Sequence, residues 1–238
     1  MNSVADPADA LEKLATHAVS EETVGAEIRL IVELAGPPVG AQAVSISLVD
    51  KNGKVGTVFS SNAATADAVD GVQYEMGTGP CLQAIRDGET QVVSSMLKES
   101  RWPEITNRAL YAGVQSVIAY PLKSKDGCFG ALNFYSSKEE AFADDAIALG
   151  SRFAARAAAR LLDATRYEAA SELASQLRQA LESRAEIDQA KGILMERHKI
   201  SADEAFERLK LISQRSSIKV RDVARMIVAE GVEPGIKP

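Results

Sequence analysis

The chain has 238 residues, of which 46% are hydrophobic, so it can bury a core and wholesale disorder is excluded. Taken alone, its net charge of −6 at pH 7 argues against nucleic-acid binding. The cysteines, Cys81 and Cys128, form no CxxC motif or Cys/His cluster, which argues against a disulfide framework or a zinc site. The first residues lack the features of a signal peptide, and no apolar run reaches the roughly 18 residues of a membrane span. We therefore expect a cytoplasmic protein without a membrane partner.

The N-terminal part begins with a helical pattern. Residues 9–35 place apolar side chains three and four positions apart, which predicts amphipathic helix, and a Gly-Pro-Pro sequence at 36–38 is expected to end it. Residues 43–50 alternate apolar residues with serine, a pattern typical of a half-buried strand. A Lys-Asn-Gly-Lys sequence at 51–54 predicts a hairpin turn into a second strand at 55–60.

The middle of the chain predicts an antiparallel sheet covered by helices. Strand-like runs follow at 90–94, 114–124 and 128–136, and the Lys-Asp-Gly sequence between the last two is a strong hairpin signal. Helical pieces are expected near 80–87 and 101–112.

Four runs in this region resemble a GAF sensory domain, and they occur in the order that the family shows. They are GTGPCLQAIRDGETQVV, RWPEITNRALYAGVQSVIAYPL, CFGALNFYS and AFADDAIALGSRFAARAAARLL. The resemblance implies a GAF domain over residues 9–165. It also implies a central antiparallel sheet with helices at its back and a small-molecule pocket at its front.

The sequence excludes the familiar ligands of this family and offers no replacement. The Asn-Lys…Phe…Asp-Glu signature of the cyclic-nucleotide subtype is absent. Haem usually needs an axial histidine, and the histidines are His17, expected on the N-terminal helix, and His198, outside the domain. Bilin is attached through a cysteine followed by histidine, whereas Leu82 follows Cys81. The cofactor is therefore unknown, and we expect a small organic ligand or none.

Cys81 is a candidate ligand or redox residue. It follows a Gly-Thr-Gly-Pro sequence and is expected to lie at the start of a helix, where the helix N-terminus lowers the pKa of a thiol. The alternative is a buried cysteine that acts as a small apolar residue.

A long helix is expected to follow the sensory domain. From Asp144 to about Glu186 the chain has no proline and a single glycine, Gly150. Apolar residues recur at intervals of four, first at Leu149, Phe153, Ala157 and Leu161 and later at Leu173, Leu177 and Leu181. An isolated amphipathic helix gains little stability alone, so the later leucines predict a parallel coiled coil between two copies over residues 166–183. We therefore expect a homodimer.

The last 50 residues predict three short helices with one basic rim. Residues 181–230 contain ten Lys or Arg and nine Asp or Glu, and Asp222 is the one acid between Arg208 and Arg225, where six residues are basic. A local basic segment on an acidic chain indicates a second part with its own partner, although such runs are also typical of solvated faces. Ser201 and Glu204 form the pattern of a capping box, and either Ser216 or Ser217 can cap the third helix.

Lys191 and Gly192 are unusual in the first of these helices. At 100° per residue, Lys191 lies inside the apolar arc, where it must extend to solvent or meet an anion. Glycine in a helix interior costs roughly 0.5–1 kcal/mol relative to alanine. Close approach of a backbone or a phosphate would justify that cost, and tight packing between helices would justify it equally well.

The sequence IDQAKGILMERHKISADEAFERLKLISQRSSIKVRDVARMIV resembles an ANTAR domain, the RNA-binding antiterminator module of bacterial regulators. The resemblance implies an ANTAR domain over residues 184–232 that binds paired RNA hairpins and blocks formation of a transcription terminator. The implied contact residues are Lys191, Gly192, Gln214, Arg215, Ser217, Lys219 and Arg221. Relatives often have asparagine at the position of Ser217.

The predicted fold class is therefore α+β: a GAF domain, a coiled-coil helix and a small three-helix ANTAR bundle. The predicted function is a signal-responsive, RNA-binding transcription antiterminator, in which the GAF domain senses a small molecule or a redox signal. A DNA-binding regulator with a GAF sensor is the alternative. No phosphate-cradling loop, metal-ligand cluster or nucleophile elbow is found in the sequence, so we expect no enzyme activity and no metal.

Overall fold

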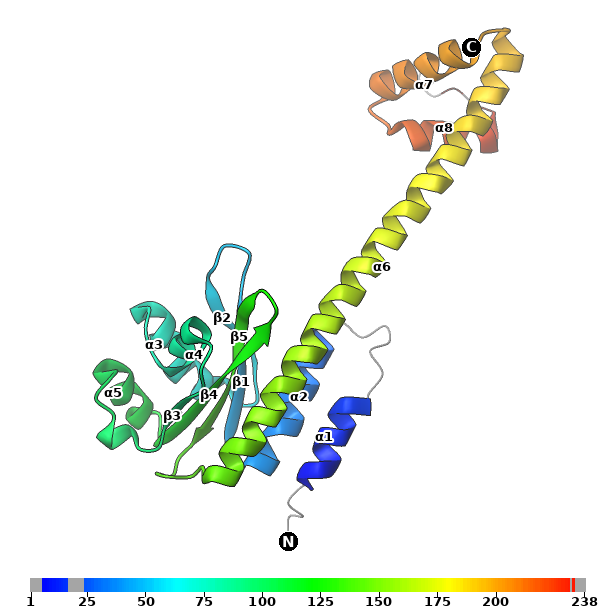
Figure 1. Ribbon diagram of the computed structural model, residues 1–238. Helices are drawn as coiled ribbons and strands as arrows, with labels where there is room; N and C mark the ends of the chain where they lie inside the picture. Colours follow the sequence, from blue (N-terminus) through cyan, green and yellow to red (C-terminus); the bar gives the residue numbers. More distant parts are fainter. Residues whose placement is uncertain (1–5, 17–23, 232, 234–238) are drawn as a thin grey trace. The chain divides into compact units, whose positions relative to one another are not determined.

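The computed structural model describes residues 6–16, 24–231 and 233, and the chain forms two compact units, Met1–Glu168 and Ala169–Pro238. Figure 1 shows a sheet flanked by helices in the first unit and a helical second unit. Among the described residues, no helix is both long and apolar enough to cross a membrane.

The first unit contains a five-stranded antiparallel sheet in the order β2-β1-β5-β4-β3. The strands are β1 (Ala43–Val49), β2 (Val55–Ser60), β3 (Gln91–Val93), β4 (Ser116–Ser124) and β5 (Gly127–Ser136). This confirms the predicted antiparallel sheet, and the two predicted hairpins join β1 to β2 and β4 to β5.

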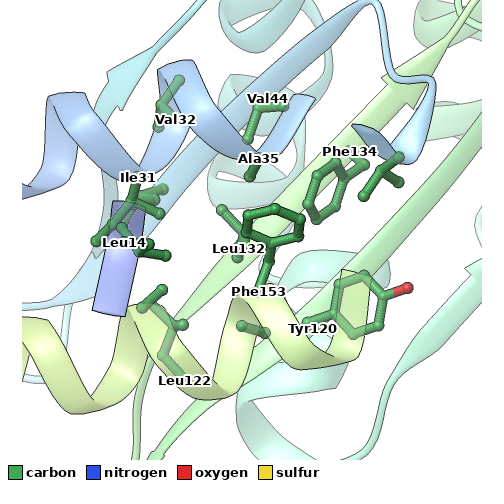
Figure 2. Packing of buried hydrophobic residues seen from close by; sticks show 14 of the residues in the cluster. Leu14, Ile31, Val32, Ala35, Val44, Tyr120, Leu122, Leu132, Phe134 and Phe153 are labelled. Atoms are coloured by element: carbon green, nitrogen blue, oxygen red, sulfur yellow. The ribbon is translucent and has the colours of Figure 1, made fainter. Parts of the chain in front are cut away.

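One face of the sheet is covered by α1 (Pro7–Thr16), α2 (Val24–Val39) and the beginning of α6 (Asp144–His198) (Figure 1). Apolar side chains from these helices and from alternate strand positions form the larger core of the unit. Figure 2 shows Phe153 of α6 beside Leu132 and Phe134 of β5 in this core.

Two details of this helical layer differ from the sequence prediction. The single helix expected over 9–35 is divided into α1 and α2, and the residues between them, including His17, lie outside the described part. The Gly-Pro-Pro sequence at 36–38 does not end α2, which continues to Val39. Proline removes only its own N–H from the helix, and the amides of Gly40 and Ala41 still donate to the carbonyls of Pro37 and Gly36.

The opposite face is covered by α3 (Ala63–Met76), α4 (Pro80–Asp87) and α5 (Pro103–Tyr111), with a short 3-10 helix at Met96–Lys98 (Figure 1). The pieces expected near 80–87 and 101–112 are confirmed as α4 and α5, whereas α3 was not predicted. Because helices cover both faces, β1 is buried on its serine side as well: Ser45 and Ser47 are fully buried. The prediction of a half-buried strand is therefore wrong.

Gly150 allows α6 to lie close to the sheet. A Cβ at this position would approach the hydroxyl of Tyr120 to 2.5 Å. That hydroxyl donates a hydrogen bond of 2.7 Å to the carbonyl of Ile147, one turn earlier on α6. The glycine is therefore required for close approach of Tyr120 to the helix.

The second unit is a three-helix bundle built from the end of α6, α7 (Ala202–Ser216) and α8 (Val220–Glu230). The first helix predicted after Arg184 is not separate, because α6 continues without interruption to His198. The buried side chains of the bundle are all apolar: Ala190, Leu194, Ala205, Leu209, Ile212, Val223, Ala224 and Ile227. Val228 of α8 lies outside this core and is 38% exposed.

A buried ion pair connects the helices behind the sheet. Nε and Nη2 of Arg160 on α6 donate to the two carboxylate oxygens of Glu27 on α2 at 2.6 and 2.5 Å. Nη1 of Arg160 donates to the carbonyl of Leu14 on α1 at 2.8 Å. One guanidinium therefore joins α1, α2 and α6. The side chains of Arg160 and Glu27 are both buried, so this ion pair is shielded from water.

We predict that Glu27→Gln lowers the free energy of unfolding by about 3–5 kcal/mol, because it leaves the Arg160 charge buried without its counter-charge. Urea unfolding followed by circular dichroism measures this change. Glu33→Gln is the matched control, since Glu33 is exposed on the same helix. Equal stability of the two variants would contradict the importance of the ion pair.

Candidate functional sites

A cluster of buried polar side chains lies between the sheet and helices α3 and α4, and Asp70 of α3 is at its centre. We call it the Asp70 cluster; its members are Ser45, Ser47, Thr57, Asp70, Gln73, Tyr74, Cys81, Asn133 and Tyr135. The carboxylate of Asp70 accepts hydrogen bonds from Tyr135 Oη at 2.5 Å, Ser45 Oγ at 2.7 Å and Thr57 Oγ1 at 2.9 Å. The sheet therefore presents donors to a carboxylate that the helix supplies.

Burial dominates the electrostatics of this cluster. Removal of the Asp70 carboxyl from water raises its pKa, and the hydrogen bonds from Tyr135, Ser45 and Thr57 oppose this effect only in part. Burial also raises the pKa of Tyr135, and the neighbouring Asp70 charge raises it further. Burial therefore disfavours the charged forms of both Asp70 and Tyr135, and hydrogen bonds hold the network together.

The loop before α4 fixes one edge of the cluster. Gly79 has φ +135°, and a Cβ there would clash with the side chain of Gln73, so this position requires glycine. The side-chain oxygen of Gln73 in turn accepts a hydrogen bond of 2.8 Å from the amide of Cys81. Gly79, the second glycine of the Gly-Thr-Gly-Pro sequence, thus allows α3 and α4 to pack together.

Cys81 lies in the first turn of α4, as predicted, but its thiol is buried in the Asp70 cluster. Its Sγ is 3.4 Å from Ser47 Oγ and 3.5 Å from Asn133 Nδ2. Burial, and then the charge of Asp70, raise its pKa to about 12. The expected lowering by the helix N-terminus is therefore wrong, because desolvation of the thiolate outweighs the helix dipole.

The cluster contains a buried polar atom without a partner among the described residues, and one of its members, Tyr74, also lines a surface hollow. Asn133 Oδ1 is buried and has no hydrogen-bond partner within the described part of the chain. Tyr74, whose hydroxyl lies 2.7 Å from both Ser47 Oγ and Thr57 Oγ1, also lines a surface hollow of about 370 Å³. Two cations, Lys54 and Arg86, lie on the rim of this hollow, so it suits a small polar or anionic molecule.

Sequence reasoning missed most of the Asp70 cluster. The available signal was the spacing of Asp70, Gln73 and Tyr74, which places three polar side chains on one face of a helix. Serines alternating along β1 supply the complementary side.

In the second unit, the predicted contact residues fall into two groups. Lys191 and Gly192 lie on α6, and the remaining five lie from the end of α7 to the start of α8: Gln214, Arg215, Ser217, Lys219 and Arg221. Lys191 is 26% exposed at its side chain and lies 3.3 Å from Asp188. Gly192 lines a hollow on the surface of the bundle, and a Cβ added there would meet no atom within 4 Å.

The connection between α7 and α8 presents cations without counter-charges. Among the described residues, Arg215 and Lys219 are exposed and have no ion-pair partner, whereas Arg221 lies 3.5 Å from Asp222. Arg225, one turn further along α8, is bound to Glu186 at 2.9 Å. The α7–α8 connection therefore carries two unpaired cations that lie close together in the chain, Arg215 and Lys219.

Ser217 caps the end of α7 rather than the start of α8. Its φ is +57°, and its amide donates to the carbonyl of Ser213. Lys219 is the N-cap of α8 and provides no side-chain cap, so the predicted capping role of Ser217 at α8 is wrong. Asparagine tolerates the left-handed conformation better than serine does, which gives a structural reason for asparagine at this position in relatives. The capping box of Ser201 and Glu204 at the start of α7 is confirmed.

No group of three or more His, Cys, Asp or Glu side chains that could hold a metal ion occurs in the part of the chain that the structure describes.

We predict that iodoacetamide alkylates Cys128 but not Cys81 in the folded protein at pH 8. With a pKa of about 12, only about one Cys81 thiol in ten thousand is ionised, and the thiol is also inaccessible. Peptide mass spectrometry measures the two sites, and alkylation in urea should modify both. Rapid modification of Cys81 in the folded chain would contradict the burial of its thiol.

Comparison with known proteins agrees with this architecture. The GAF domain family matches residues 21–162 and the ANTAR domain family matches residues 175–228. No curated protein matches the chain.

Several solved structures share the fold of the first unit. A domain of a putative two-component sensor histidine kinase from Sinorhizobium meliloti 1021 has a TM-score of 0.51 at 17% identity, over 63% of this chain and 99% of that chain. The GAF domain of a phosphoenolpyruvate-protein phosphotransferase from Coxiella burnetii has a TM-score of 0.51 at 14% identity, over 71% and 99%. Free methionine-R-sulfoxide reductase from Neisseria meningitidis has a TM-score of 0.50 at 20% identity, over 71% and 95%. At these identities the likeness concerns the fold alone. The chain belongs to the GAF domain family and carries an ANTAR domain after the GAF domain, which is the architecture of a signal-responsive regulator.

Proposed function

We propose that the protein is a transcription antiterminator whose ANTAR bundle binds paired hairpins in nascent RNA under the control of its GAF domain. The observation that carries this proposal is the match to the ANTAR domain at 175–228, together with the unpaired cations at the α7–α8 connection. Phosphates dominate the affinity of nucleic-acid complexes, so a local positive surface is needed on a chain with a net charge of −6. Both domains are regulatory, and we propose no catalytic activity.

The surroundings of Gly192 support a role in binding rather than in packing. Tight contact between helices within the bundle would place atoms of α7 or α8 against the glycine, and none lies within 4 Å of an added Cβ. The glycine therefore lowers the stability of the helix at a position where no neighbouring atom requires a glycine. We infer that Gly192 allows close approach of the RNA, with Lys191 beside it as the charge.

We further propose that the protein is a homodimer joined through α6. Leu173, Leu177 and Leu181 are 56%, 57% and 69% exposed in the single chain, although they form one stripe at intervals of four. A second copy is the occupant that the sequence pattern fits, because a parallel coiled coil would cover the same stripe on both helices. We accordingly divide the chain into a GAF domain over 9–165, a connecting helix over 166–183 and an ANTAR domain over 184–232.

The signal is proposed to be a small molecule bound near the Asp70 cluster. The hollow beside Tyr74 leads toward this cluster, and a ligand there could change the hydrogen bonds that connect the sheet to α3. The raised pKa of Cys81 makes direct oxidation of this thiol slow, so we favour ligand binding over a redox signal.

We predict that the full chain binds hairpin RNA more tightly than duplex DNA of the same sequence, and that Lys219→Ala weakens binding to all hairpins alike. Loss of one phosphate contact should also reduce the slope of log K against log salt by about 1. Fluorescence anisotropy with unlabelled DNA as competitor measures both effects. Lys138→Ala is the matched control, because Lys138 is exposed in the first unit. Equal competition by duplex DNA would instead indicate a DNA-binding regulator.

We predict that Gly192→Leu lowers RNA affinity while the thermal stability of the protein holds or rises. Leucine has higher helix propensity by roughly 1 kcal/mol, and its side chain would fill the hollow that Gly192 lines. Calorimetry and anisotropy on the same preparation separate the two effects. Unfolding of the bundle would show that the glycine serves packing, and unchanged RNA affinity would show that it serves neither role.

A further inference from the structure

A single carboxylate is held by three basic side chains at the end of the bundle. Glu233 follows α8, and its Oε2 accepts a hydrogen bond of 2.7 Å from Arg208 Nε on α7. Its Oε1 lies 2.7 Å from His198 Nε2 and 3.8 Å from Arg197 Nη1, both at the end of α6. Arg197 also donates a hydrogen bond of 2.9 Å to the carbonyl of Gly231.

The environment of Glu233 favours a negative charge. Its side chain is 9% exposed, and burial alone would raise the pKa of the carboxyl. The hydrogen bonds from His198 and Arg208 outweigh this effect and hold the pKa below its usual range. Donors on both oxygens, from two helices, form an arrangement that also suits the oxygens of a phosphate.

This site adjoins the hollow at Gly192. Arg197 belongs to both: it contacts Glu233 and Gly231, and it lines the hollow with Gly192, Ile193 and Val228. The hollow measures about 660 Å³, and Gln189 and Glu196 complete its lining. A strand whose phosphate replaced the Glu233 carboxylate would therefore bring a nucleotide next to Gly192. Unpaired bases of RNA loops stack on arginine guanidinium groups, and Arg197 offers one at this hollow.

We propose that Arg197, His198 and Arg208 form a phosphate-binding site that Glu233 occupies in the free protein, and that a backbone phosphate of hairpin RNA displaces Glu233 on binding. This inference rests on the proposed RNA-binding function. Glu233 then acts as an internal competitor, because the energy needed to release it is subtracted from the energy of RNA binding. The site extends the predicted interface, which had included none of these four residues.

The first test compares hairpin RNA binding by the full chain with that of two glutamine variants. Glu233→Gln removes the competing charge, so RNA affinity should rise by about threefold to tenfold at 0.1 M salt. Glu230→Gln removes an exposed carboxylate three residues earlier and serves as the matched control, with a change below about twofold. Equal affinities of the two variants would overturn the proposal, as would a loss of affinity in Glu233→Gln with unchanged thermal stability.

The second test separates this proposal from the proposed function. The chain contains only two histidines, His17 and His198, so the imidazole NMR signals report directly on the site once His198→Gln has assigned them. Inorganic phosphate should shift the His198 signal of Glu233→Gln saturably and at lower concentration than in the wild-type chain. Adding Arg208→Gln should abolish the shift.

The outcomes of the two tests are distinguishable. If no form binds hairpin RNA, the proposed function fails, and the phosphate titration still decides the site. A His198 shift that depends on Arg208 supports the site, and the absence of a shift overturns it.

Discussion

The continuity of α6 is the constraint on which the rest of the structure depends. One uninterrupted helix supplies Phe153, Ala157 and Leu161 to the core of the first unit and Ala190 and Leu194 to the core of the second. The helix continues between the two cores, although the intervening residues are exposed in a single chain. A helix that is polar or exposed on all sides gains little stability of its own. The coiled-coil proposal follows from this requirement.

The two faces of the sheet are built on different physical principles. The face under α1, α2 and α6 is held by apolar packing, in which Phe153 lies beside β5 (Figure 2), and by the buried pair of Glu27 and Arg160. The face under α3 and α4 carries the Asp70 cluster, where burial must be offset by hydrogen bonds. Buried polar networks specify one arrangement of their members, and a new hydrogen-bonding partner disturbs them more than it disturbs an apolar core. This is the physical reason to place the proposed sensory input on the Asp70 cluster.

The sequence predicted the elements whose apolar residues follow a regular period. The strands and the packing faces of α7 and α8 show such a period, as does α6 on both sides of its exposed stretch. The sequence did not predict α3. Asp70 and Gln73 lie on the buried face of that helix and remove the contrast between an apolar and a polar side.

The remaining differences depend on tertiary structure. The left-handed conformation of Ser217 is a property of the connection between two packed helices, which the preferences of serine do not indicate. The same holds for the pKa of Cys81, where the helix position was predicted and the burial was not. Glu233 meets Arg208 across 25 residues and His198 across 35, so no local pattern could have indicated the contact.

In the proposed dimer, two chains paired through α6 would present two ANTAR bundles to one transcript. The most direct measurement compares the binding of an RNA with two hairpins to that of an RNA with either hairpin alone. We expect the full chain to bind the two-hairpin RNA at least about tenfold more tightly, because the second contact is intramolecular. Replacing Leu173 and Leu177 by lysine should remove this advantage and leave single-hairpin binding in place. Equal affinity of the full chain for one and two hairpins would contradict the binding of one transcript by two paired bundles.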